Sequence, residues 1–175
     1  INKEIVSLIN HSGGKAVGLS GKDAGLIRAE RLSATAEADL GRVGKVRGVD
    51  PTILTTLDQG RFIPVIAPIG VDEAGQALNI NADLVAAAVA EALRAEKLVL
   101  LTDVEGVRDA KGTLLSTLKR NEAIQMMEQG VISGGMAPAS RTETLEPAIR
   151  AALEARARIP KPAAPRITIK VTARP

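Results

Sequence analysis

The sequence predicts an α/β fold, a three-layer αβα sandwich in which helices cover both faces of a mainly parallel central sheet. Short apolar runs alternate along the chain with stretches of helical periodicity, an order typical of parallel strands joined by helices. The 175 residues, 45% of them hydrophobic, are enough for one domain with a core of its own.

The elements of the first half follow from periodicity and from glycine and proline positions. Residues 2–12 read as a short helix that Gly13 and Gly14 end. Pro51 opens a second helix, through Leu57, because proline fits the first helical position, and Asp50 suits its cap. The remaining segments are strands expected at 15–19, 26–32, 40–49, 62–67 and 77–80, turns at 20–25 and 70–76, and a loop at 33–38.

The clearest helix of the second half covers residues 82–95, with a row of apolar residues on one side. Asn81 can cap this helix, and Asp83 falls in its first turn, where a carboxylate faces the positive end of the helix dipole. The segments that follow are a strand at 97–102, a hairpin at 109–112, a helix at 121–128 ended by Gly130, a glycine loop at 131–136 and a helix at 140–158.

Composition excludes several classes of function. The chain has no cysteine, hence no disulfide framework and no thiolate metal site, which fits a cytoplasmic protein. Phe62 is its only aromatic residue, so a protein that stacks nucleic-acid bases on aromatic rings is not expected. The net charge of +3 is too small to indicate a polyanionic partner, and no apolar run is typical of a membrane span. We therefore expect neither a nucleic acid nor a membrane as partner.

The last 36 residues differ in composition from the rest. Residues 140–175 hold eight of the 23 basic residues, three of the 20 acidic residues and five of the nine prolines. We therefore expect a main domain at 1–139 and a separate basic helix and Pro-rich tail at 140–175. The abrupt change in composition near residue 139 suggests the hypothesis that this tail is an out-of-frame or otherwise non-native ending, and a solvated basic tail is the alternative.

Two acidic positions are candidates for chemistry. The run Asn79-Ile80-Asn81-Ala82-Asp83 places short polar side chains at a helix start, and Asp103 closes the apolar strand 98–101. Ligands of open α/β sheets collect at the carboxyl ends of strands. Each residue also has a purely structural interpretation: Asp83 favours its helix dipole, Asn81 caps the helix, and Asp103 begins a turn. The Ser20-Gly21-Lys22-Asp23 turn suggests a phosphate cradle but lacks P-loop spacing, which favours a structural turn.

Several runs together resemble the amino-acid kinase family, and within it the branch that phosphorylates N-acetyl-L-glutamate. The matching runs are Val17-Gly18-Leu19-Ser20-Gly21-Lys22-Asp23, Phe62-Ile63-Pro64-Val65-Ile66-Ala67-Pro68-Ile69-Gly70, Asn79-Ile80-Asn81-Ala82-Asp83, Leu100-Leu101-Thr102-Asp103-Val104-Glu105-Gly106-Val107 and Gly130-Val131-Ile132-Ser133-Gly134-Gly135-Met136. They occur in order over residues 1–138, and their combination is specific where each alone is not. The resemblance implies a truncated, amino-acid-kinase-like fold.

The resemblance also implies an activity and residue roles. The activity is phosphoryl transfer from ATP, with Mg²⁺, to the side-chain carboxylate of N-acetyl-L-glutamate, the second step of arginine synthesis. Asn79 matches the substrate-binding asparagine, and Asp83 matches the acid that organises catalytic lysines. The nucleotide-binding segments are matched by Asp103, Val104, Glu105, Gly106, Val107, Arg108, Val131, Ile132 and Ser133. Family members assemble as homo-oligomers, so self-association is compatible with the resemblance.

The chain departs from the family pattern in ways that bear on activity. The family's upstream lysine, glycine-rich loop and substrate arginine have no counterpart, and Ala139 stands where the pattern Met-x-Pro-Lys places a second lysine. We therefore expect this chain alone to be nearly inactive. Two alternatives stay open: a nucleotide-binding module without catalysis, and a sister kinase acting on aspartate, glutamate or a nucleoside monophosphate.

Overall fold

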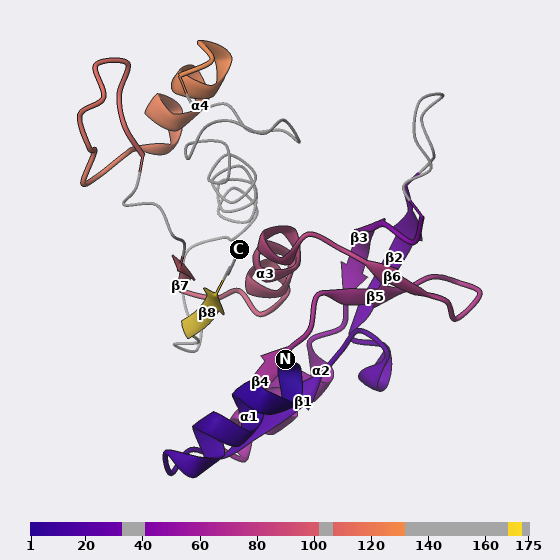
Figure 1. The fold of residues 1–175 in the computed structure, drawn as a ribbon. Helices are drawn as coiled ribbons and strands as arrows, with labels where there is room; N and C mark the ends of the chain where they lie inside the picture. The colour runs from indigo at the N-terminus through magenta and orange to yellow at the C-terminus, as the bar shows by residue number, and fades with distance from the viewer. Residues whose placement is uncertain (33–40, 102–106, 132–167, 173–175) are drawn as a thin grey trace.

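The computed structural model describes residues 1–32, 41–101, 107–131 and 168–172 (Figure 1). Over these residues helices are interspersed among the strands, and the strands form three small sheets. The α/β class predicted from the sequence is confirmed. No helix in the described ranges combines the length and apolarity needed to cross a membrane.

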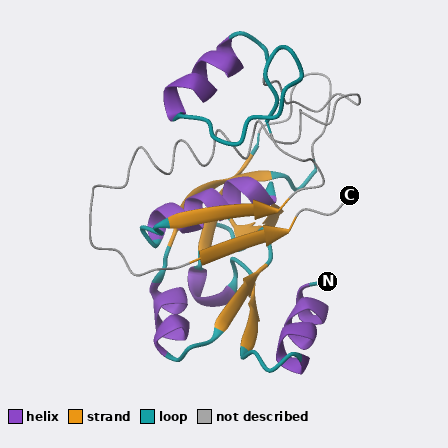
Figure 2. Cartoon of the chain, turned by 90° about the vertical axis from the view of Figure 1, so that its left-hand side faces the viewer, coloured by secondary structure: helices purple, strands orange, loops and turns teal. Residues whose placement is uncertain are grey.

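The first sheet is a parallel pair with a helix on each side. β1 and β4 run in register from Ala16 opposite Ile63 to Leu19 opposite Ile66. Figure 2 shows α1 and α2 flanking this pair, which gives the helix–sheet–helix layering that the sequence predicts. The bounds of these elements are α1 Asn2–His11, β1 Ala16–Leu19, α2 Thr52–Gln59 and β4 Ile63–Ile66.

The second sheet has four strands in the order β3-β2-β5-β6 and mixes both strand directions. β2 pairs antiparallel with β3 and parallel with β5, and β5 turns back into β6. A short 3-10 helix, η1, joins the first sheet to this one. The bounds are η1 Asp23–Gly25, β2 Ile27–Arg31, β3 Gly44–Val49, β5 Ile69–Val71 and β6 Ala77–Asn79.

Helix α3 (Ala82–Ala92) provides one side of the hydrophobic core. Its residues Val85 and Val89 pack with Leu78 and Ile80, which lead into the helix, and with Leu54 of α2. All five side chains are almost completely buried. The first residues of α3 are therefore held in place by the core directly behind them.

The last two strands, β7 and β8, lie against α3. They form a parallel pair. In Figures 1 and 2, α4 and the loop before it lie apart from the sheets. The bounds are β7 Lys97–Leu101, α4 Arg120–Glu128 and β8 Thr168–Thr172.

Several boundaries differ from those predicted. The strand expected at 40–49 begins at Gly44, and the helix expected to reach residue 95 ends at Ala92, because Arg94 adopts a left-handed φ of 51°. The turn expected at 70–76 begins with strand β5, in which Gly70 pairs with Leu78. Strand β8 was not predicted at all. The loop at 33–38 and the helix at 140–158 lie outside the described residues.

Candidate functional site

The connection from β6 to α3 carries the polar residues that the sequence singles out. Asn79, the last residue of β6, is exposed, and its backbone N–H donates to the carbonyl oxygen of Arg42 at 2.7 Å. Ile80 turns into the core, and its N–H donates to the Pro68 carbonyl at 3.0 Å. The sheet therefore fixes the main chain just before the helix.

Asn81 is the N-cap of α3, as predicted. Its ψ of 128° is not helical, and its Oδ1 accepts from the backbone N–H of Asp83 at 2.9 Å and of Leu84 at 3.2 Å. These bonds satisfy two N–H groups that have no partner within the helix. The side chain thus determines where the first turn begins.

Asp83 is half-buried in that first turn. Burial raises the pKa of its carboxyl above the usual value, because the charged form is less well hydrated there. The helix dipole favours the charged form and opposes this shift. No hydrogen bond or ion pair joins the carboxylate to any of the residues that the structure describes. A cationic group brought to this point would therefore stabilise the carboxylate.

The Ser20–Asp23 turn at the carboxyl end of β1 is closed by its own hydrogen bonds. One carboxylate oxygen of Asp23 accepts from the Ser20 backbone N–H at 2.6 Å and from the Ser20 hydroxyl at 2.9 Å. These two bonds lower the pKa of the Asp23 carboxyl, with a smaller contribution from Lys3. Because the Ser20 amide is already occupied by a protein carboxylate, the geometry favours a structural turn over a phosphate cradle.

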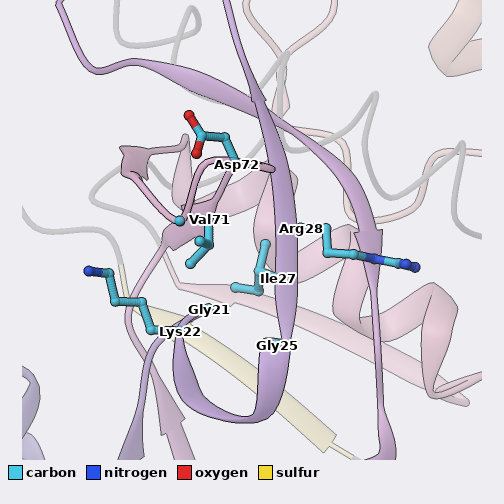
Figure 3. A pocket seen from close by; sticks show the side chains of 8 residues that line it. Gly21, Lys22, Gly25, Ile27, Arg28, Val71 and Asp72 are labelled. Atoms are coloured by element: carbon cyan, nitrogen blue, oxygen red, sulfur yellow. The ribbon is translucent and has the colours of Figure 1, made fainter.

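A hollow of about 360 Å³ lies beside this turn (Figure 3). In that view the Lys22 and Arg28 side chains extend in opposite directions, so the two cations do not converge on one point. Asn79 and Asp83 do not line the hollow. Its lining consists of Gly21, Lys22, Gly25, Ile27, Arg28, Val71, Asp72 and Gly75.

The residues predicted to bind nucleotide are only partly described. Arg108 and Leu114 form an isolated antiparallel β-bridge across a turn. The Arg108 guanidinium donates to the Gly112 carbonyl at 2.7 Å. Val107 precedes this turn, and Val131 follows α4, with its N–H donating to the Met126 carbonyl at 2.9 Å. The other six predicted residues lie outside the described ranges: Asp103, Val104, Glu105, Gly106, Ile132 and Ser133. We expect Asp103 to share one cleft with Asn79 and Asp83, and this stays a prediction because Asp103 lies outside the described residues.

The sequence analysis did not identify two residues of α1, Asn2 and Lys3, whose side chains contact the carboxyl ends of the parallel strands β1 and β4. The Asn2 side-chain amide donates to the carbonyls of Val65 at 2.9 Å and Leu19 at 3.4 Å, so it joins β4 to β1. The Lys3 ammonium donates to the Gly18 carbonyl at 3.2 Å. A Cβ on Gly18 would collide with the Asn2 side chain. A glycine inside a predicted strand was the signal that another group approaches closely there.

The described residues do not by themselves make a metal site. No cluster of three or more His, Cys, Asp or Glu side chains occurs among them. Asp83 is a single carboxylate, whereas protein sites for Mg²⁺ commonly combine one or two carboxylates with waters and substrate phosphates. Within the described ranges, the residues therefore do not fit a protein-held Mg²⁺ ion.

Comparison with known proteins finds related sequences over most of the chain. The model of the amino acid kinase family matches residues 1–157. The chain is 54% identical over 147 residues to the acetylglutamate kinase of Syntrophus aciditrophicus, an alignment covering 79% of this chain and 50% of the relative. It is 51% identical over 163 residues to the acetylglutamate kinase of Oleidesulfovibrio alaskensis, covering 87% of this chain and 55% of the relative. The chain thus spans about half the length of these curated relatives.

Solved structures share the fold. A crystal structure from Streptococcus mutans superposes with a TM-score of 0.70 at 27% identity, covering 87% of this chain and 58% of the other. The N-acetylglutamate synthase of Neisseria gonorrhoeae, solved with coenzyme A and L-arginine, gives a TM-score of 0.58 at 28% identity, covering 81% of this chain and 30% of the other. The predicted arrangement of helices around parallel strands therefore occurs in experimental structures.

Proposed function

Because this chain belongs to the amino acid kinase family, we propose that it is part of an acetylglutamate kinase. The proposed enzyme transfers a phosphoryl group from ATP to the side-chain carboxylate of N-acetyl-L-glutamate, a step of arginine biosynthesis in the cytoplasm. The observation that carries the proposal is the 54% identity over 147 residues to a curated acetylglutamate kinase. That alignment covers half of the relative, so the activity is proposed for the protein that contains this segment.

The proposed reaction brings two anions together, and this requirement fits the roles proposed for the β6–α3 connection. Phosphoryl transfer depends mainly on positioning and on neutralising charge. Asn79 offers amide donors and a carbonyl to a bound carboxylate. Asp83 would repel phosphate directly, so its role is to hold cationic lysines supplied from elsewhere in the protein. The absence of a described counter-ion beside Asp83 supports that role.

The nucleotide side of the site is proposed at residues 103–108 and 131–133. Mg²⁺ would arrive bound to the phosphates of ATP, where it would neutralise their charge, and we assign it no protein ligand. Specificity for N-acetyl-L-glutamate over aspartate, glutamate or a nucleoside monophosphate rests on the likeness to the acetylglutamate kinases.

A coupled assay of ADP release tests the function. The intact protein that contains this segment is compared with the acetylglutamate kinase of Syntrophus aciditrophicus as positive control. We expect ADP release that requires both ATP and N-acetyl-L-glutamate, and trapping of the acyl phosphate product by hydroxylamine. Preference for aspartate, glutamate or a nucleoside monophosphate would identify a sister kinase. Binding of ATP without any turnover would instead identify a nucleotide-binding module.

A further inference from the structure

The main chain between Asn79 and Asp83 is anchored on both sides. On the strand side, Asn79 and Ile80 donate their N–H groups to the carbonyls of Arg42 and Pro68. On the helix side, Val85 is buried in the core. Asn81 lies between the two anchors and is itself exposed.

The hydrogen bonds of the Asn81 side chain lead directly to Asp83. Its Oδ1 accepts only from the N–H groups of Asp83 and Leu84, and its amide nitrogen has no partner within the described part of the chain. One oxygen atom therefore holds the first turn of α3. Loss of that oxygen would free the backbone of Asp83 before it freed any core residue.

The charge of the cap also matters at this place. Asn, Asp and Ser cap helices about equally well, so helix stability alone does not distinguish them. An aspartate at position 81 would add a second carboxylate two residues from Asp83. A site that must receive a carboxylate and a triphosphate would be penalised by that added negative charge. Asparagine supplies the same acceptor oxygen without the charge.

We infer that Asn81 is a positioning residue, a neutral cap that fixes Asp83 relative to Asn79 while keeping negative charge out of the site. The inference deepens the proposed kinase function and rests on it for the use of Asn79 and Asp83. The effect of the Asn81 cap on the position of Asp83 is a property of the folded chain, so it can be measured without an activity assay.

The first experiment follows the Asp83 carboxyl by NMR titration in the 175-residue chain. Burial raises its pKa in the wild type. Asn81→Ala should shift this pKa back toward its usual value, because the first turn opens to water, whereas Asn81→Ser should keep it. Asp50→Ala is the matched control, because the Asp50 carboxylate accepts from the Thr52 N–H at 3.0 Å just before α2, whose N-cap is Pro51. It should leave the Asp83 titration unchanged. An unchanged Asp83 titration in Asn81→Ala would overturn the inference.

The second experiment separates the charge from the cap. Asn81→Asp should keep the melting temperature of the wild type yet weaken binding of ATP and N-acetyl-L-glutamate to the intact protein about five- to tenfold in calorimetry. Asn81→Ser should bind as the wild type does. Equal binding by Asn81→Asp and the wild type would refute the need for a neutral cap. If the wild-type protein binds neither ligand, the proposed function fails, while the titration still decides whether Asn81 positions Asp83.

Discussion

At the scale of single residues, Asp83 is subject to two opposing effects. Burial raises the pKa of its carboxyl, whereas its place in the first turn of α3 favours the charged form. The dipole term at a partly exposed helix end is worth about 0.3–1 kcal/mol. Because the carboxylate also lacks a counter-ion among the described residues, we expect desolvation to outweigh the dipole.

Asp83→Asn tests which effect dominates. A pKa raised above 3.8 means that the folded state binds the Asp83 proton more tightly, so the contribution of Asp83 to stability falls as pH rises from 3.8 through its folded pKa. The variant lacks this loss and should be more stable at neutral pH by less than about 1 kcal/mol, since solvent screens a half-exposed group. The difference should vanish below pH 3.8. Urea unfolding of both proteins across this range provides the measurement, and a wild type that becomes more stable relative to the variant as pH rises would show that the dipole dominates.

Gly21 is required by close packing and not by an unusual φ. A Cβ at this position would meet the Ile69 carbonyl oxygen and would lie 2.8 Å from the Cβ of Ile27. Gly21→Ala should therefore cost about 1–3 kcal/mol of unfolding free energy, as overpacking usually does. Gly48→Ala is the control, because its nearest neighbour is the flexible Arg28 guanidinium at 3.0 Å, and it should stay within about 0.5 kcal/mol of the wild type. Equal losses in the two variants would contradict the packing argument.

At the scale of elements, β6 connects the core to the candidate site. Leu78 in the middle of β6 is 2% exposed and packs with α3. Leu78→Ala should lower the free energy of unfolding by about 2–5 kcal/mol, whereas Leu114→Ala, at a side chain that is 45% exposed, should change it by no more than about 0.5 kcal/mol. Chemical denaturation of both variants is the measurement. A small loss at Leu78 would mean that β6 is not part of the cooperative core.

The pairing of β8 with β7 gives a second prediction at this scale. Each residue of Lys97–Leu101 lies opposite one residue of Thr168–Thr172 in a parallel ladder. Removing residues 168–175 should increase amide hydrogen exchange in β7, because its ladder bonds are lost, and leave exchange in β1 unchanged. Mass spectrometry of peptides from both strands checks this. Unaltered exchange in β7 would argue against the pairing.

Elements with local signals could be predicted from the sequence, and those that depend on distant partners could not. The helix at 2–11 and the cap at Asn81 were predictable because periodicity and capping residues lie within the segment. The short strand β5 was missed, since its glycine and polar neighbours indicate a turn and only pairing with β2 and β6 makes it a strand. β8 was missed because its partner β7 is far away in the sequence.

The same limit applies to the candidate site. The short polar residues before α3 indicated Asn79 and Asp83 as candidates, yet no local pattern reveals that Asp83 is half-buried without a described counter-ion. Burial depends on the packing of α3 against Leu78 and Ile80, which is a property of the folded chain. The hydrogen bonds from the Asn2 side chain to β1 and to β4 likewise depend on the folded structure and have no local sequence signal.

At the scale of the whole molecule, the question is how much of the proposed reaction this chain can carry. Its curated relatives are about twice as long, and Ala139 stands where the resemblance to the family implies a lysine. Removing one preorganised charge-stabilising group typically lowers the rate about 10²–10³-fold. We therefore expect the 175-residue chain alone to release ADP at least about 10³-fold more slowly than the acetylglutamate kinase of Syntrophus aciditrophicus under the same conditions.

Adding the missing charge back makes this expectation specific. If the deficit is a lack of lysines, Ala139→Lys should increase ADP release by the chain, while Ala139→Gln, which extends the side chain without a charge, should not. A coupled assay with saturating ATP and N-acetyl-L-glutamate measures both variants beside the wild type. Turnover by the unmodified chain close to that of the control enzyme would show that the charge neutralisation already comes from residues within it. In that case the assignment of Asp83 as a partner of lysines supplied from elsewhere would have to be abandoned.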